Sequence, residues 1–414
     1  MPSLDPLRAI LSNRQFTLLW GGQTVSQFGD GIVSVALPLL VLQTTGSAVD
    51  LGLVVAARLV PTVAFLLIGG AVTDRASRRL LMLVSDASRA IITTTLGLLA
   101  LSGVLNFSEL VAGSLLFGTF DALFYPSSSA LYPELINAEL LIQANSLRQS
   151  SGTISASLLG PVVGGVIAST IGTSWSLLID AGTFVVSAGC LLAMRATPRP
   201  APTGASVLAD IAAGIRFCRR TPWIAWTLIV AAFANAIIFM PIAVLLPLLF
   251  KRTLHSPDWM VGVGFAAFGV GSLIGALLLA FLPKPKRRVG TMWVLWTSAA
   301  FLTVGYGVAP STWTACLALL TIGPLLMGGQ VIWESLLQAE VPREMLGRVS
   351  SVDFMVSFAL APIGVAVAGV AAGVVGVRFA IVFPALFVGA FSLTVLLAVR
   401  SLTALDREPP AAIA

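Results

Sequence analysis

Residues 37–54 read LPLLVLQTTGSAVDLGLV, and residues 246–263 read LPLLFKRTLHSPDWMVGV. The two stretches align without a gap at a displacement of 209 residues, and each carries a proline at its second position (Pro38 and Pro247). A shared proline in the same register argues against a chance match between two apolar runs. We therefore expect an internal duplication, in which the chain contains two related halves.

The composition places this duplicated chain in a membrane. Of 414 residues, 57% are hydrophobic and only 10% are charged, and the mean hydropathy is +0.97. Soluble domains carry about 25% charged residues, so this chain has too few charges to cover its own surface in water. Its formal charge of +6 is explained by basic loops. We expect no nucleic-acid partner, since no basic stripe with interleaved aromatic residues occurs.

The apolar runs predict about twelve membrane-spanning helices. A span needs about 20 largely apolar residues, and continuous runs without period-two alternation exclude barrel strands. The fold class expected is therefore an all-α integral membrane protein. The predicted spans are 17–42, 51–72, 80–102, 109–131, 147–169, 175–194, 223–250, 260–282, 290–308, 313–337, 350–374 and 378–399.

The basic residues predict the orientation of these spans. With the N-terminus inside, the outer loops receive only Lys251, Arg252 and Arg378, whereas the other loop Lys and Arg residues lie on the inner side. Positive charge marks cytoplasmic loops. We therefore expect a multi-pass protein of the bacterial plasma (inner) membrane with both termini in the cytoplasm.

The longest connection predicts the boundary between the halves. Residues 195–222 begin RATPRPAPTGAS, whose Pro, Gly and Ser residues are typical of a linker, and continue as LADIAAGIRFCRRTPW. The second part mixes apolar residues with arginines, as expected for an amphipathic helix at the membrane surface. We predict an N-terminal six-helix bundle over 1–194, a cytoplasmic linker over 195–222 and a C-terminal six-helix bundle over 223–414.

The loop after the second predicted span carries a motif. It reads GAVTDRASRR over residues 70–79, and it resembles the major-facilitator loop pattern G-x-x-x-D-R-x-G-R-R, with Ser77 where glycine is usual. The resemblance implies two pseudo-symmetric six-helix bundles that expose a central pathway alternately to each side. It also implies a cytoplasmic gate in which the motif's acid meets the N-terminal end of a helix from the other half, here the helix after Gly347. The candidate gating residues are Gly70, Asp74, Arg75, Arg78 and Arg79.

Further charged residues are candidate partners of this gate. Asp86 and Arg89 are three residues apart on the third span, so they are expected to pair with each other or with the Asp74 loop. Arg348 and Asp353 lie near the start of the eleventh span and are expected to belong to the same latch.

The fifth span and several longer strings narrow the resemblance. Gly160, Pro161, Gly164 and Gly165 form a GPxxGG pattern that resembles part of a motif of drug:proton antiporters, although a plain packing face of glycines has the same form. SQFGDGIVSVALPLLVL (26–42) and VPREMLGRVSS (341–351) are among the strings similar to the macrolide-efflux and enterobactin-exporter-like bacterial group. The resemblance covers about residues 10–400 and implies export of small molecules. One departure is that Asp121, and no arginine, stands in the fourth span.

Ionisable groups inside the spans are the candidate coupling and substrate residues, because charges at membrane depth are costly. At about 1.5 Å per residue, Asp30 and Asp121 lie about 18 Å from the outer ends of their helices, and Arg58 lies about 10 Å from its outer end. We expect these three side chains to form one polar cluster that carries protons. The alternatives are a static ion pair that only fixes the packing of the helices, and an Arg58 side chain that extends outward to the membrane surface.

Two more acids lie within spans. Glu334 is expected either to attract a cationic substrate, to carry a proton, or to pair with Arg348 or a loop arginine. Asp180 lies midway along the sixth span and is either part of the cavity or structural.

The remaining residues exclude most enzymes. The single histidine, His255, lies in an external loop, no GxxxxGK[ST] motif occurs, and the three cysteines lack metal or redox spacing. We expect no enzyme activity, no cofactor and no metal. The predicted function is secondary active export of small amphipathic or hydrophobic molecules, driven by proton antiport. We expect the protein to act as a monomer in contact with membrane lipid. The alternatives are a non-coupled facilitator, a lipid or lysolipid flippase, or a receptor-like remnant of the same fold.

Overall fold

The computed structural model is helical throughout the part of the chain that it describes, residues 5–66, 77–137, 140–195, 207–281, 285–399, 402 and 406. Twelve helical segments of this part are long and apolar enough to cross a membrane, as the sequence predicted. Many large apolar side chains are exposed along them, including Phe281, Val374 and Leu397, as expected for surfaces that face lipid.

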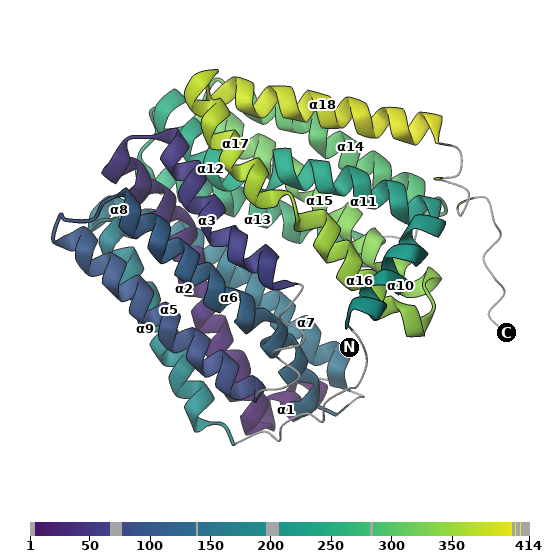
Figure 1. Cartoon of the computed structure of the whole chain (residues 1–414), viewed down its shortest axis with the longest axis horizontal. Helices are drawn as coiled ribbons and strands as arrows, with labels where there is room; N and C mark the ends of the chain where they lie inside the picture. Colours follow the sequence, from purple (N-terminus) through teal and green to yellow (C-terminus); the bar gives the residue numbers. More distant parts are fainter. Residues whose placement is uncertain are drawn as a thin grey trace. The chain divides into compact units, whose positions relative to one another are not determined.

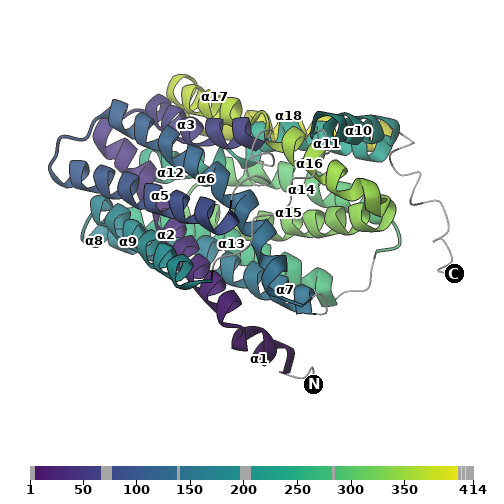
Figure 2. The same cartoon turned by 60° about the horizontal axis from the view of Figure 1, so that its bottom comes forward.

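The chain forms two compact units, residues 1–204 with 255–266 and residues 205–254 with 267–414 (Figures 1 and 2). The boundary at residues 204 and 205 falls inside the predicted linker, but the short stretch 255–266 groups with the first unit. The division into two six-helix bundles stays a prediction.

The first unit is built from α1 (Asp5–Ser12), α2 (Arg14–Thr45), α3 (Ala48–Leu66), α5 (Arg78–Leu101), α6 (Phe107–Leu135), α7 (Leu141–Gly152), the π-helix η2 (Thr153–Leu159), α8 (Gly160–Thr170) and α9 (Thr173–Ala193). Within it, α9 packs along both α2 and α5, and α6 packs along both α3 and α5 (Figure 1). This arrangement brings the middles of α2, α3, α5, α6 and α9 close together.

The second unit is built from α10 (Val207–Arg220), α11 (Pro222–Ala234), the π-helix η3 (Asn235–Phe239), α12 (Ile242–Leu248), the π-helix η4 (Leu249–Thr253), α13 (Asp258–Phe281), α14 (Arg288–Gly307), α15 (Thr312–Glu340), α16 (Arg343–Phe358), α17 (Ala361–Val374) and α18 (Val377–Ala398). The first residues of α13 belong to the first unit. Here α14 packs along both α15 and α18, and α10 packs along α16. The helix α10 lies in the stretch predicted to hold an amphipathic surface helix.

Three spans are interrupted rather than straight. The fifth contains η2, the seventh contains η3 and η4, and the eleventh breaks between α16 and α17. Pro161 and Pro362 each stand in the first turn of the helix that resumes after a break, where the N–H that proline lacks would have no partner within the helix. The fifth and eleventh spans thus break at equivalent places in the two halves.

Candidate functional site

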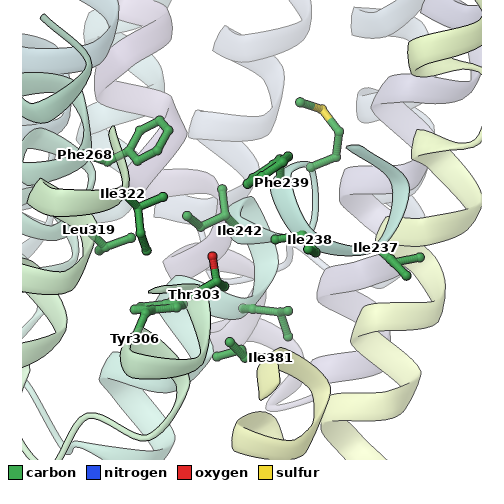
Figure 3. Close-up of a pocket in the computed structure, with 12 residues that line it drawn as sticks. Ile237, Ile238, Phe239, Ile242, Phe268, Thr303, Tyr306, Leu319, Ile322 and Ile381 are labelled. Atoms are coloured by element: carbon green, nitrogen blue, oxygen red, sulfur yellow. The ribbon is translucent and has the colours of Figure 1, made fainter. Parts of the chain in front are cut away.

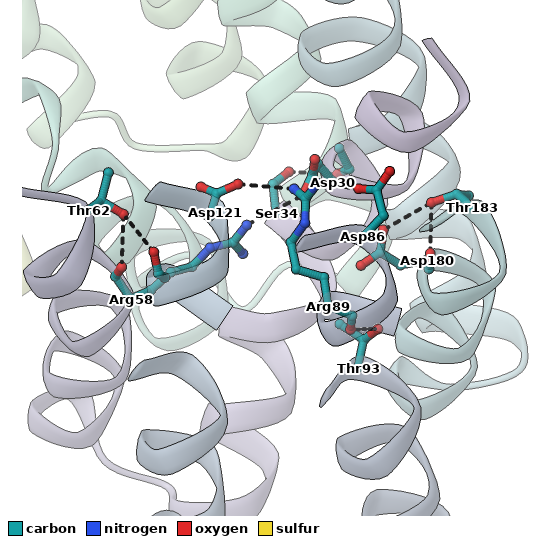
Figure 4. Close-up of polar contacts among 12 residues, drawn as sticks. Asp30, Ser34, Arg58, Thr62, Asp86, Arg89, Thr93, Asp121, Asp180 and Thr183 are labelled. Atoms are coloured by element: carbon teal, nitrogen blue, oxygen red, sulfur yellow. Dashed lines mark hydrogen bonds and ion pairs between the residues drawn. The ribbon is translucent and has the colours of Figure 1, made fainter. Parts of the chain in front are cut away.

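Charged side chains from five helices meet in the middle of the first unit (Figure 4). Arg58 on α3 contacts Asp30 on α2, with Nη2 and Oδ1 3.4 Å apart. Arg89 on α5 binds two acids: its Nη2 lies 2.5 Å from Asp86 Oδ1, and its Nη1 lies 3.0 Å from Asp121 Oδ1 on α6. We call Asp30, Arg58, Asp86, Arg89, Asp121 and the neighbouring Asp180 the charge cluster.

This grouping differs in part from the one expected from sequence. Arg58 points toward Asp30 and not to the membrane surface, but the ion-pair partner of Asp121 is Arg89, whereas we had grouped Asp121 with Arg58. Asp86 and Arg89 do pair with each other, as one of the two expectations had it. The structure places that pair in the charge cluster, and its role in the cytoplasmic latch stays a prediction.

The cluster has a buried end and an accessible end. The side chains of Asp86 and Arg89 are 0% and 2% exposed, whereas that of Asp121 is 38% exposed. Asp30 and Arg58 are intermediate. Among the described residues, one oxygen of Asp86 and one of Asp180 are buried without a hydrogen-bond partner. The two unpartnered carboxylate oxygens therefore lie on buried side chains, and the more exposed carboxylates of the cluster are those of Asp121 and Asp30.

Aromatic rings enclose the Arg89 guanidinium. Its Cζ lies 4.2 Å from the centre of the Phe124 ring and 4.5 Å from that of Phe184, and the Phe117 ring lies 5.8 Å away. The Arg58 guanidinium also lies over the Phe117 ring, with its Cζ 4.0 Å from the ring centre. Ring faces attract cations more strongly when water is excluded. The rings thus help to hold two cations at membrane depth.

Glycine allows the helices that carry these groups to approach closely. A Cβ on Gly118 of α6 would overlap the carbonyl oxygen of Arg58 on α3, so only glycine fits beside Phe117 and within one turn of Asp121. Thr62 crosses the same contact, since its hydroxyl lies within hydrogen-bond distance of the carbonyl oxygens of Arg58 and Gly118. These contacts fix the register of α3 against α6.

Asp180 joins the cluster from α9. It is fully buried, and its backbone and carboxylate oxygens accept hydrogen bonds from the Thr183 hydroxyl. A Cβ on Gly29 would overlap Asp180 and Thr183, so α2 lies directly against this carboxyl one residue before Asp30.

The glycines of the fifth-span motif pack beside the cluster. Gly160 faces Gly31 of α2 with no room for a Cβ on either residue, and Gly164 faces the Ile32 backbone in the same way. Pro161 stands at the start of α8, and Gly165 faces the Trp259 backbone. The motif therefore acts as a packing face that lies against the helix segment next to Asp30.

The gating motif is only partly described. Gly70, Asp74 and Arg75 lie outside the described residues. Arg78 forms an ion pair with Glu134 at the end of α6, and Arg79 donates to the Leu191 and Leu192 carbonyl oxygens of α9 at 2.5 and 2.8 Å. These arginines bind elements of their own unit.

The second unit contains an ion pair equivalent to the one between Arg78 and Glu134, and neither pair was predicted from the sequence. Arg288 at the start of α14 lies 2.6 Å from Glu340 at the end of α15. The 209-residue displacement puts Arg288 on Arg79, next to Arg78, and Glu134 and Glu340 both end the helix that follows. The signal was available, because each acid is the last acidic residue before its loop.

The remaining candidates lie in the second unit. Asp353 accepts hydrogen bonds from Trp333 Nε1 at 2.9 Å and Ser357 at 3.2 Å, and Glu334 is exposed and accepts from Gln330 on its own helix at 3.1 Å. Arg348 lies 3.6 Å from the Met345 sulfur. In the described part of the chain, no group of His, Cys, Asp or Glu is placed to hold a metal ion.

The charge cluster contains more acidic than basic side chains. Four carboxyl groups face two guanidinium groups, so full ionisation would leave a net negative charge inside the membrane. Uncompensated charge is unfavourable there, and a proton is the smallest ion that removes it.

Comparison with known proteins identifies the fold and the relatives. The family model described as transmembrane secretion effector matches residues 4–413. The multidrug efflux pump Tap of Mycolicibacterium fortuitum is 29% identical over 379 residues, covering 87% of this chain and 90% of the pump. The enterobactin exporter EntS of Escherichia coli O81 (strain ED1a) is 26% identical over 346 residues, covering 83% and 82%.

Two solved structures share the fold. A bacterial homolog of the human lysosomal transporter Spinster, inward-facing and unoccupied, has a TM-score of 0.70 at 16% identity and covers 96% of this chain and 98% of its own. The nucleoside transporter NupG has a TM-score of 0.66 at 14% identity, covering 94% and 98%.

Proposed function

Because the chain belongs to the transmembrane secretion effector family of major-facilitator transporters, we propose that it exports small amphipathic or hydrophobic molecules by proton antiport. It is a multi-pass membrane transporter and not an enzyme, as its relatives are transporters. The relatives named for multidrug and enterobactin export support an outward direction. The proposal places the protein in the bacterial plasma membrane, with both termini in the cytoplasm, as a monomer surrounded by lipid.

The observation that carries proton coupling is the charge cluster. Its acids outnumber its bases, and it joins an accessible carboxyl, Asp121, to a buried one, Asp86, through the single guanidinium of Arg89. The fourth span has Asp121 and no arginine, and the arginine that binds this aspartate is Arg89 of the third span. When Asp121 or Asp30 takes up a proton, its ion pair with an arginine of a neighbouring helix weakens. Protonation would therefore lower the free energy needed to move α2, α3, α5 and α6 relative to one another.

Cytoplasmic gating is the second part of the proposal. Asp74 and Arg75 are assigned to the gate with Arg348 and Asp353 on the strength of the motif, and Glu334 and Asp180 are assigned to the substrate and proton pathway on their position within spans. Arg78 and Arg79 stabilise the first unit beside this gate through Glu134 and α9.

The test is export from a strain that lacks its own pumps. Macrolides, siderophores, dyes and lysolipids are screened first, and the best exported compound is then measured with Asp30→Asn. We expect this variant to be inserted normally and to lose export against a concentration gradient, because the Asn side chain does not bind and release a proton in the physiological pH range.

The matched control is Asp50→Asn, which removes the same charge from the first turn of α3, outside the cluster. This variant should export the compound at the rate of the unmodified protein, and an uncoupler should abolish that export. Uncoupler-insensitive export that Asp30→Asn leaves intact would contradict antiport and favour the facilitator or flippase alternative.

A further inference from the structure

The second unit contains an apolar cavity that is distinct from the charge cluster (Figure 3). Its volume is about 200 Å³, and residues of η3, α12, α13, α14, α15 and α18 line it. An apolar cavity of about 150 Å³ stays dry and holds benzene. This cavity therefore has room for one ring with a small substituent.

The cavity has a mouth and a floor. Phe239 and Phe268 are half-buried on one side, whereas Thr303, Tyr306 and Ile381 are buried on the opposite side (Figure 3). A ligand that lies between the phenylalanine rings and the floor can therefore contact the Thr303 hydroxyl at the floor (Figure 3).

The floor selects the polarity of the ligand. The Thr303 hydroxyl points into the cavity and donates its only hydrogen to the Ala299 carbonyl oxygen at 2.9 Å, so it is left with acceptor capacity (Figure 3). A ligand group with an N–H or O–H could donate to this Thr303 oxygen, which is 2.9 Å from the Ala299 carbonyl oxygen and otherwise faces apolar side chains.

The wall of the cavity is an interrupted helix. The π-helix η3 ends at Phe239, and Pro241 separates it from α12. A Cβ on Gly364 of α17 would overlap the Ala236 carbonyl oxygen, and the Asn235 amide donates to the Ser357 carbonyl oxygen at 3.2 Å. Single π turns are frequent at functional sites, and broken spans line binding sites in transporters. The contacts with Gly364 and Ser357 therefore fix the interrupted segment on one side, and its other side lines the cavity.

From this geometry we propose that the cavity is a binding site for a neutral, single-ring molecule or substituent that carries a hydrogen-bond donor, as a phenol does. The ring lies between Phe239, Ile242 and Ile322, and the donor reaches Thr303 Oγ1. The inference does not rest on the proposed transport, because it concerns binding to the second unit alone.

The test uses para-fluorophenol and its methyl ether, para-fluoroanisole, which has no donor. Fluorine NMR is recorded with the purified full chain in detergent micelles, and empty micelles give the background from partitioning. We expect saturable binding of the phenol on the order of 1 mM for a ligand of about seven buried heavy atoms, and binding of the ether weaker by about fivefold.

Two variants separate the cavity from other sites. Ile242→Trp fills it from a half-buried position and should abolish saturable binding of both probes. Thr303→Val has nearly the same shape without the hydroxyl, so it should bind the ether as before and lose the preference for the phenol.

Saturable binding that survives in a folded Ile242→Trp protein would overturn the site. The absence of saturable binding to the unmodified protein, as expected if lipid or detergent already fills the cavity, would overturn it as well. If Ile242→Trp does not fold, Thr303→Val decides alone, since an unchanged preference for the phenol overturns the assignment.

Discussion

Replacing Arg89 by methionine is expected to destabilise the first unit far more than the same change at Arg58. The Arg89 side chain is 2% exposed and binds Asp86, which is 0% exposed, and Asp121. Its removal leaves the Asp86 charge buried without compensation, which costs about 3–5 kcal/mol. Arg58 is 25% exposed, and besides its stacking on Phe117 it has one ion pair among the described residues, at 3.4 Å, so its removal costs about 1 kcal/mol.

The assay is thermal unfolding of the purified variants in one detergent, followed by tryptophan fluorescence. For a unit of about 200 residues, 1 kcal/mol shifts the midpoint by about 2–4 °C. We therefore expect a decrease of about 6–20 °C for Arg89→Met and about 2–4 °C for Arg58→Met.

A double variant tests the cause. Adding Asp86→Asn to Arg89→Met removes the uncompensated charge and should restore at least half of the lost stability, although Asp86→Asn alone is destabilising. Midpoints that simply add, or an Arg89→Met protein as stable as Arg58→Met, would refute the view that this ion pair is energetically coupled inside the membrane.

Three further outcomes follow from the contacts. Gly118→Ala should lower the unfolding midpoint through overlap with the Arg58 carbonyl oxygen, at a cost of about 1–3 kcal/mol, whereas Gly182→Ala, which meets no atom within 4 Å, should be neutral or stabilising in the same measurement. Glu134→Gln and Glu340→Gln should each cost less than about 1 kcal/mol, with the loss shrinking at high salt, because both pairs are partly exposed; a loss that salt leaves unchanged would contradict this. Burial, with a smaller contribution from Asp353, raises the pKa of Cys218 on α10 from 9.0 to about 11, so the folded state holds the thiol proton more tightly; stability should therefore fall as the pH rises from about 9 to 11, and this fall should be shallower in a Cys218→Ala protein, whereas an unchanged slope would contradict the assignment.

The sequence predicted what is encoded locally. Each span is recognisable from its own apolar run, and the pairing of Asp86 with Arg89 follows from their spacing on one helix. The bond from Arg89 to Asp121 depends on how α5 is rotated against α6, which no local pattern states. Depth was the available signal: at about 1.5 Å per residue, Arg89 lies about 20 Å from the outer end of its predicted span and Asp121 about 18 Å from that of the next.

The cavity could not be predicted in the same way. It exists because η3 and Pro241 interrupt one span while neighbouring side chains leave the space unfilled. Packing of several helices decides such a space, and the sequence signals only the break.

The internal repeat shows how one scaffold supports two kinds of site. Features that hold helices in place recur in both halves, as the pairs Arg78–Glu134 and Arg288–Glu340 do. The charge cluster does not recur, because the 209-residue displacement puts Ser298 in the place of Arg89 and Phe239 in the place of Asp30. Phe239 stands at the mouth of the apolar cavity. The same helix position thus carries a carboxylate in one half and an aromatic ring in the other, so substitution at equivalent positions of one repeated scaffold gives a charged cluster in one unit and an apolar cavity in the other.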